Sequence, residues 1–241
     1  TKEMIASVLS EKYAVLKTEG NYNNEIGLPL TIFKIREEHE AAVLEMGISE
    51  FGEMHRLAAM ANPDVCVITN IGLCHLENLK TRDGILKAKT EVFDHLKKGG
   101  TAILNGDDDK LSTIRQVYEK APVFYGVGEK MEYREDVKKT VYATDVENLG
   151  LFGMQAIIHT PDGERKVQIP IPGEHNVYNA LAATAVGLSF GLSLDQIKAG
   201  IEKAKTIGGR TNLLQVNGMT VIDDCYNANP VSMKASIDVL A

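Results

Sequence analysis

The sequence predicts an α/β protein built on a doubly wound, mostly parallel sheet, with a small antiparallel β region in its second half. The first observation is that short apolar runs alternate with helical patterns from residue 1 to about residue 125. Such continuous runs are typical of strands buried on both faces of a parallel sheet. The second observation is that, after about residue 131, three segments alternate polar and apolar residues as antiparallel strands do.

The first half is expected to alternate helices and strands from its first residues. Met4, Ile5, Val8 and Leu9 form one apolar helical stripe. Further helices are expected over 28–33, 53–60, 82–98 and 110–120, and strands over 14–16, 41–44, 65–68, 102–104 and 123–125. Gly99-Gly100 ends the longest of these helices. Strands joined through helices favour parallel pairing, because such crossovers return in the same direction.

The second half is expected to begin with antiparallel strands over 137–146, 152–159 and 165–171, with a turn at Pro161-Asp162-Gly163. Helices are predicted over 176–191 and 194–204, the second with Ser193 as its N-cap. Asn217-Gly218 predicts a hairpin between 213–216 and 219–222. Asn229-Pro230 then predicts the start of a last helix.

We assign residues 1–208 to one central domain and residues 209–241 to the beginning of a second domain. The second segment holds one strand–helix step, which is too short to build a domain alone. Both ends of the chain fall within helical patterns. We therefore expect the chain to be part of a longer protein.

The composition is that of an ordinary soluble globular protein: 241 residues, 44% hydrophobic and 24% charged, with a net charge of -7. No basic patch stands out, which argues against a nucleic-acid partner. The sequence has no apolar stretch long enough to insert in a membrane and no signal peptide. Cys66, Cys74 and Cys225 lack metal-ligand spacing, so we expect reduced thiols in a cytoplasmic protein. We also expect a monomer.

Polar side chains gather at the carboxyl ends of the predicted parallel strands, where open sheets bind ligands. Glu45 follows one strand, and Asn70 and His75 follow the next. Asn105 and Asp107 follow a third strand. Each has a simpler interpretation as well: Glu45 could cap a helix, and His75 could be an ordinary loop histidine with satisfied hydrogen bonds.

Lys89 is the most informative of these residues because it lies on the apolar stripe of the predicted 82–98 helix. The stripe consists of Ile85, Lys89, Val92, Phe93 and Leu96. A buried ammonium is costly without a partner; the side chain could extend to solvent, or it could stay neutral and react with CO2. The resulting carbamate is a carboxylate on a long arm. Together with Glu45 and His75 it would suit Mg²⁺ or Mn²⁺ better than zinc.

Three further features of the second half could bind a nucleotide. Asn176 and Asn179 lie i, i+3 at a helix start, where their amides could bind an adenine edge or simply cap the helix. Arg210 follows two glycines and could neutralise a phosphate, or be an ordinary linker residue. Asp224 follows a strand and could bind ribose hydroxyls or cap a helix.

Together, these segments resemble the Mur ligase family of peptidoglycan synthesis. The resemblance runs through essentially the whole chain. Its most specific stretches are residues 18–29, 45–47, 69–77, 87–89, 173–176, 209–211 and 223–230. Their order along the chain makes the resemblance more specific than any one stretch does.

The resemblance implies the central ATP-binding domain of such a ligase, with a fold like that of P-loop ATPases, followed by the start of a Rossmann-like domain. ATP would phosphorylate the carboxylate of UDP-N-acetylmuramoyl-tripeptide. The amine of D-alanyl-D-alanine would then attack the acyl phosphate. Positioning and charge neutralisation carry most of the catalysis in such reactions.

The resemblance also implies roles for individual residues. Glu45, His75 and a carbamate on Lys89 would bind magnesium, with two ions expected. Lys89, Arg210 and His75 would be the catalytic residues. Asn176 and Asn179 would lie by the adenine, Asp224 by the ribose and Arg210 by the γ-phosphate, and His175 would also bind the nucleotide. Asn23 and Asn24 would line the ligand cleft.

One departure concerns the phosphate loop, because no Gly-x-x-x-x-Gly-Lys-Ser/Thr sequence is present. Residues 1–4 resemble those that follow this loop in the family, so we expect the chain to begin after it and to be inactive alone. Two alternatives stay open: another ligase of the superfamily, such as folylpolyglutamate synthase, or a non-catalytic scaffold without the loop. The missing Gly-x-Gly-x-x-Gly fingerprint argues against a dinucleotide-dependent oxidoreductase.

Overall fold

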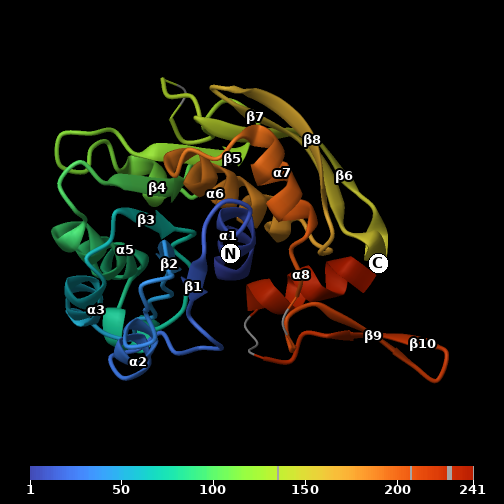
Figure 1. Ribbon diagram of the computed structural model, residues 1–241, viewed down its shortest axis with the longest axis horizontal. Helices are drawn as coiled ribbons and strands as arrows, with labels where there is room; N and C mark the ends of the chain where they lie inside the picture. Colours follow the sequence, from blue (N-terminus) through green and yellow to red (C-terminus); the bar gives the residue numbers. More distant parts are fainter. Residues whose placement is uncertain (135, 207, 227–229, 241) are drawn as a thin grey trace.

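The computed structural model describes residues 1–134, 136–206, 208–226 and 230–240. Its centre is a six-stranded sheet in the order β3-β4-β5-β6-β7-β8 (Figure 1). The strands are β3 (Val65–Ile68), β4 (Thr101–Asn105), β5 (Val123–Val127), β6 (Val141–Asn148), β7 (Met154–Thr160) and β8 (Gly163–Ile169). β3 to β6 pair in parallel, and β7 and β8 continue the sheet antiparallel. The predicted fold class is therefore confirmed, with the antiparallel region joined to the parallel one.

Helices cover both faces of this sheet. α1 (Lys2–Leu9), α6 (His175–Ser189) and α7 (Leu194–Glu202) bury the larger apolar cluster on one face. α2 (Gly27–Ile32), α3 (Glu53–Ala61) and α5 (Arg82–Thr90) contribute to a second cluster on the other. Ile103 belongs to the first cluster, while Ala102 and Leu104 belong to the second, because successive side chains of a strand point to opposite faces. The sheet is doubly wound, as predicted.

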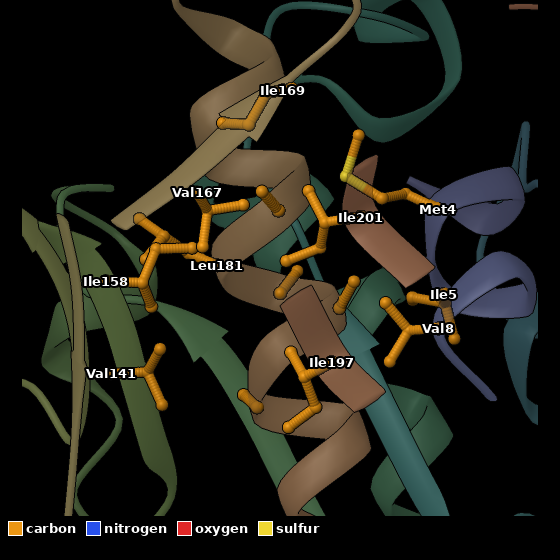
Figure 2. Close-up of a cluster of buried hydrophobic side chains, with 14 of the residues drawn as sticks. Met4, Ile5, Val8, Val141, Ile158, Val167, Ile169, Leu181, Ile197 and Ile201 are labelled. Atoms are coloured by element: carbon orange, nitrogen blue, oxygen red, sulfur yellow. The ribbon is translucent and has the colours of Figure 1, made fainter. Parts of the chain in front are cut away.

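Close packing of α1 against α7 depends on a glycine. A Cβ atom at Gly200 would lie 2.4 Å from the Cα atom of Val8, so only glycine allows this approach. Figure 2 shows Ile197 and Ile201 of α7 beside Val8 in the same apolar cluster. Ser193 caps α7 through a capping box with Gln196, which confirms the predicted N-cap.

Two shorter β pairs lie outside the main sheet. β1 (Val15–Lys17) and β2 (Ala41–Val43) form a parallel pair of their own. The prediction that residues 41–44 are buried on both faces is wrong, because Ala42 is exposed on β2. β9 (Asn212–Val216) and β10 (Met219–Asp223) form the predicted hairpin. Its turn residues Asn217 and Gly218 have φ values of 51° and 79°, as a two-residue primed turn requires.

The predicted 82–98 helix ends early. α5 stops at Thr90 and continues as the 3₁₀ helix η1 (Glu91–His95). The Thr90 hydroxyl donates to the carbonyl oxygens of Leu86 and Lys87, and such bonds bend or end a helix.

The predicted 110–120 helix is wrong. Only η2 (Leu111–Thr113) forms, followed by a bridge between Val117 and Lys120, with Tyr118 at φ 53°. The segment contains the β-branched residues Thr113, Ile114 and Val117, which favour extended structure.

α8 (Pro230–Leu240) forms where a last helix was expected, and its predicted cap, Asn229, lies outside the described residues. Cys66, Cys74 and Cys225 are free. Among the residues described, no helix is both long and apolar enough to cross a lipid bilayer.

Candidate functional site

Glu45 follows β2, and its side chain is held from two sides. Nδ2 of Asn23 donates to Oε1 of Glu45 over 2.8 Å, and Nζ of Lys2 lies 3.4 Å from Oε2. Lys2 also donates to the carbonyl oxygen of Gly20 over 2.8 Å, and its side chain is almost buried. The backbone N–H of Glu45 donates to the hydroxyl of Thr18, which is fully buried. The carboxylate is thus fixed between an amide and an ammonium; the sequence analysis assigned no role to Lys2.

Asn24, the second asparagine predicted to line the cleft, has a structural use. Its Oδ1 accepts hydrogen bonds from the backbone N–H groups of Ile26 and Gly27, over 3.1 and 2.8 Å. These bonds satisfy donors at the start of α2. Contact of Asn23 or Asn24 with a ligand stays a prediction.

Lys89 lies on α5 at the boundary between core and surface. Its Nζ donates to the carbonyl oxygen of Asn70 over 2.8 Å, which ties α5 to the loop after β3. Burial lowers the pKa of the Lys89 amine, since the interior disfavours its charged form. Lys87, two residues earlier, is exposed and lies over the ring of Phe51. The lower exposure of Lys89 compared with Lys87 agrees with the prediction that Lys89 lies on the apolar stripe of the helix.

The loop that carries His75 is fixed by Arg82, the first residue of α5, and by an acidic residue that follows β4. Oδ2 of Asp108 accepts the N–H of Ile71 over 2.7 Å, and Nε of Arg82 donates to the Ile71 carbonyl over 3.0 Å. Arg82 also forms a two-pronged ion pair with Asp109. His75 itself has a left-handed φ of 61° as N-cap of α4 (Leu76–Leu79).

A shared metal site for Glu45, His75 and Lys89 stays a prediction. Glu45 follows β2, whereas His75 and the partner of Lys89 belong to the loop after β3. In the described part of the chain, no three His, Cys, Asp or Glu side chains come together as a metal cage.

The start of α6 holds three predicted nucleotide residues in one hydrogen-bonded group. Nδ2 of Asn176 donates to the carbonyl oxygen of Pro172 over 2.8 Å and lies 3.0 Å from Nε2 of His175. Oδ1 of Asn176 accepts from Asn179 over 2.9 Å, and Oδ1 of Asn179 accepts from the hydroxyl of Thr1. These bonds hold the amides of Asn176 and Asn179 beside Thr1, the residue that precedes α1.

The acidic residues after β10 hold the glycine-rich joint. Oδ2 of Asp223 accepts the N–H of Gly209 over 2.9 Å, and Oδ1 of Asp224 accepts the N–H of Thr211 over 3.0 Å. Between these contacts, the guanidinium of Arg210 lies 4.2 Å from the ring centre of Tyr226. These hydrogen bonds hold the 209–211 segment against the acidic residues at the end of β10.

These groups converge on the beginning of α1. The hydroxyl of Thr1 donates to Oδ1 of Asn179 on α6, and Nζ of Lys2 lies 3.4 Å from the carboxylate of Glu45. Burial lowers the pKa of His175, on which the charge of Asp224 also acts. The residue Glu45, which follows β2, and the amides at the start of α6 thus meet at the beginning of α1.

Lys139, which no sequence signal marked, forms a buried cluster with Asp107 at the ends of β4 and β5. Nζ of Lys139 ion-pairs with Asp107 and donates to the carbonyl oxygens of Val127, Gly128 and Lys130. Asp107 also accepts from the hydroxyl of Tyr178 over 3.1 Å. The cluster lines a cavity of about 580 Å³. No periodicity marks Lys139, because it lies in a loop before β6.

Comparison with known proteins agrees with this architecture. Residues 1–187 match the family described as the Mur ligase middle domain. The chain belongs to the Mur ligase family. A UDP-N-acetylmuramoyl-tripeptide–D-alanyl-D-alanine ligase of Bacillus subtilis (strain 168) is 41% identical to this Mur ligase chain, over 99% of the chain and 50% of that protein.

Two solved Mur ligases have a similar structure. MurF from Acinetobacter baumannii superposes with a TM-score of 0.90 at 39% identity, over 99% of this chain and 51% of that one. MurF ligase from Thermotoga maritima, solved in complex with ADP, has a TM-score of 0.83 at 30% identity, over 99% and 53%. The chain spans about half the length of the curated relatives it matches.

Proposed function

We propose that this chain forms the central, ATP-binding part of a ligase that joins D-alanyl-D-alanine to UDP-N-acetylmuramoyl-tripeptide in cytoplasmic peptidoglycan synthesis. The observation that carries the proposal is that the start of α1 contacts Glu45 through Lys2 and the Asn176–Asn179 pair of α6 through Thr1. Similarity to ligases named for this reaction supports the substrate pair. The solved ADP complex of the Thermotoga maritima relative supports nucleotide binding.

The residues fit magnesium held jointly by protein and nucleotide. Mg²⁺ is usually bound through one or two carboxylates plus substrate phosphates, without a dedicated protein cage. Glu45 offers one such carboxylate, already fixed by Asn23 and Lys2. His75 and a carbamate on Lys89 would complete the protein ligands, with two ions expected. When bound, the ions would neutralise charge on the phosphates.

Lys89 is suited to carbamate formation. Its lowered pKa favours the neutral amine, whose lone pair attacks the carbon of CO2. A C–N bond forms and one proton is released, which leaves a carboxylate on the side chain. The hydrogen bond to Asn70 holds this side chain at the end of β3.

The proposed chemistry proceeds in two transfers. An oxygen of the tripeptide carboxylate bonds to the γ-phosphorus of ATP, and the bond to ADP breaks. The amine of D-alanyl-D-alanine then bonds to the acyl carbon, and phosphate leaves after the tetrahedral intermediate loses a proton from nitrogen. Arg210 would neutralise the transferred phosphate from the joint before β9, because guanidinium groups bind phosphate oxygens in pairs.

The nucleotide would lie between α6 and the joint. Asn176, Asn179 and His175 would contact the adenine, and Asp224 the ribose. Asn23 and Asn24 would line the cleft on the substrate side. Residues 209–241 would begin a second domain, and Arg210 at its start would reach the phosphate from the Gly208-Gly209 joint.

The test measures ADP release and ligated product by the full-length enzyme that contains this chain. We expect turnover only when ATP, UDP-N-acetylmuramoyl-tripeptide and D-alanyl-D-alanine are all present. Glu45→Gln should lower turnover strongly, whereas Glu37→Gln, an exposed glutamate outside the site, should not. Turnover with a folate and glutamate instead would support the superfamily alternative, and failure to bind ATP would support a scaffold.

A further inference from the structure

Two histidines face each other on the side of the sheet away from α1. His55 belongs to α3 and His95 is the last residue of η1. Their Nε2 atoms lie 3.2 Å apart, and their ring centres lie 4.3 Å apart with the planes inclined by 66°. Neither residue belongs to the site proposed above.

A hydrogen bond alone explains this geometry poorly. If one Nε2–H pointed straight at the other Nε2, the ring centres would be separated by the N···N distance plus a ring radius at each end. The observed ring centres are much closer than that, so at least one ring is tilted away from the line between the nitrogens. An in-line hydrogen bond therefore does not account for the pair, and the two nitrogens are close enough to share one ion.

Asp94 prepares His55 as a ligand. Oδ2 of Asp94 lies 3.3 Å from Nδ1 of His55, so the carboxylate accepts the Nδ1 proton. This tautomer leaves Nε2 of His55, which lies 3.2 Å from Nε2 of His95, without a proton. A carboxylate behind the coordinating imidazole is the usual second partner of metal-bound histidines, where it fixes the ring and raises its basicity.

The backbone around the pair is held in place independently. The carboxylate of Glu91, the first residue of η1, accepts the N–H of Gly52 over 3.0 Å and the N–H of His55 over 3.3 Å. The start of α3 is thus tied to η1 by a charged group that is not one of the two histidines. Substitution of either histidine would leave this tie intact.

We propose that His55 and His95 form a binding site for a divalent transition-metal ion. Two nitrogens 3.2 Å apart, each about 2.05 Å from one ion, subtend roughly 100° at it, between square and tetrahedral angles. Imidazole suits Zn²⁺, Ni²⁺ and Cu²⁺, with Cu²⁺ bound most tightly of the three. Among the described side chains no third His, Cys, Asp or Glu joins the pair, so water completes the coordination shell.

Binding would join α3 to η1 through the ion. An ion that binds the folded state and not the unfolded chain raises the free energy of unfolding in proportion to the logarithm of its concentration. The site would therefore act as a metal-dependent clamp on the helical layer that also carries Lys89.

The test is a calorimetric titration of the purified full-length protein with Ni²⁺, without ATP or magnesium, together with thermal unfolding at each Ni²⁺ concentration. We expect one site whose occupation raises the unfolding temperature. His55→Gln and His95→Gln should each weaken binding at least about tenfold and remove the rise. Asp94→Asn should weaken binding about 10- to 100-fold, as expected for a carboxylate behind a ligand.

His39→Gln is the matched control, because His39 lies elsewhere and accepts a hydrogen bond from the backbone of Arg36. It should bind Ni²⁺ as the unchanged protein does. Ni²⁺ affinity that is the same in His55→Gln and His95→Gln as in the unchanged protein would overturn the proposal. Absence of any Ni²⁺-dependent rise in unfolding temperature in the unchanged protein would overturn it as well.

Discussion

The amine of Lys89 donates a hydrogen bond over 2.8 Å to the backbone carbonyl of Asn70, nineteen residues earlier. The contact joins α5 to the loop that leaves β3 at its carboxyl end. Burial lowers the pKa of Lys89. The Asn70 carbonyl accepts a hydrogen bond from the amine but carries no negative charge that would stabilise the ammonium form. A lysine in such a position can hold a neutral amine, which is the form that reacts with CO2.

Replacing Lys89 by methionine is expected to lower ligation by the full-length enzyme on the order of 10²-fold, as loss of a group that stabilises transition-state charge does. Added acetate should restore part of the activity by supplying a carboxylate. Lys87→Met is the control on the same helix and should retain activity, because Lys87 is exposed. Normal turnover by Lys89→Met would exclude the carbamate.

His175 predicts a pH-dependent stability. Burial lowers its pKa below the ordinary 6.5, so the unfolded chain binds the proton more readily than the folded one. Stability is therefore greatest above pH 6.5 and falls as the pH drops toward the folded pKa. Relative to His175→Gln, the unchanged protein should lose free energy of unfolding between about pH 7.5 and about pH 5 in urea titrations. Parallel curves for the two proteins would contradict this.

Asp108 is expected to matter more for stability than its neighbour Asp109. Asp108 accepts the backbone N–H groups of Ile71, Lys110 and Leu111. Asp108→Ala should lower the free energy of unfolding by about 2–3 kcal/mol, since buried donors lose a charged acceptor. Asp109→Ala removes an ion pair whose carboxylate is 38% exposed, and should cost less than about 1 kcal/mol. Equal effects in urea unfolding would refute this ranking.

Lys139 is expected to be the most sensitive charged residue of the buried cluster. Lys139→Met leaves Asp107 without its cation and three backbone carbonyls without a donor. The expected loss is about 3–5 kcal/mol, typical of breaking a buried ion pair from one side. Lys138→Met, at a 69% exposed neighbouring side chain, should unfold as the unchanged protein does. Chemical-denaturation curves of the two variants measure both losses, and equal losses would contradict the prediction.

Local sequence patterns predicted local structure well. Ser193 and Gln196 encode their capping box within four residues, and Asn217-Gly218 encodes a hairpin turn in two. The patterns failed where periodicity was the only signal. The 110–120 segment has helical spacing, but its β-branched residues and the contacts of Asp108 favour a short 3₁₀ turn instead.

Some residues of the candidate site could likewise be predicted from a local pattern, and others could not. The lowered pKa of Lys89 agrees with the place of this residue on an apolar stripe. Lys2 carried no such signal, and its importance depends on Glu45, forty-three residues later. Lys139 was missed for the same reason, because its partner Asp107 precedes β5 and the residue itself follows it.

The order of residues fixed the α/β class, the turns and caps, and which side chains could carry chemistry, because these depend on interactions between residues a few positions apart. The packed chain alone decided that Glu45 and Asn179 meet the start of α1, and that His55 faces His95. Such meetings are set by how helices pack on the two faces of the sheet. No short-range pattern encodes that packing, since it sums many weak contacts between distant segments.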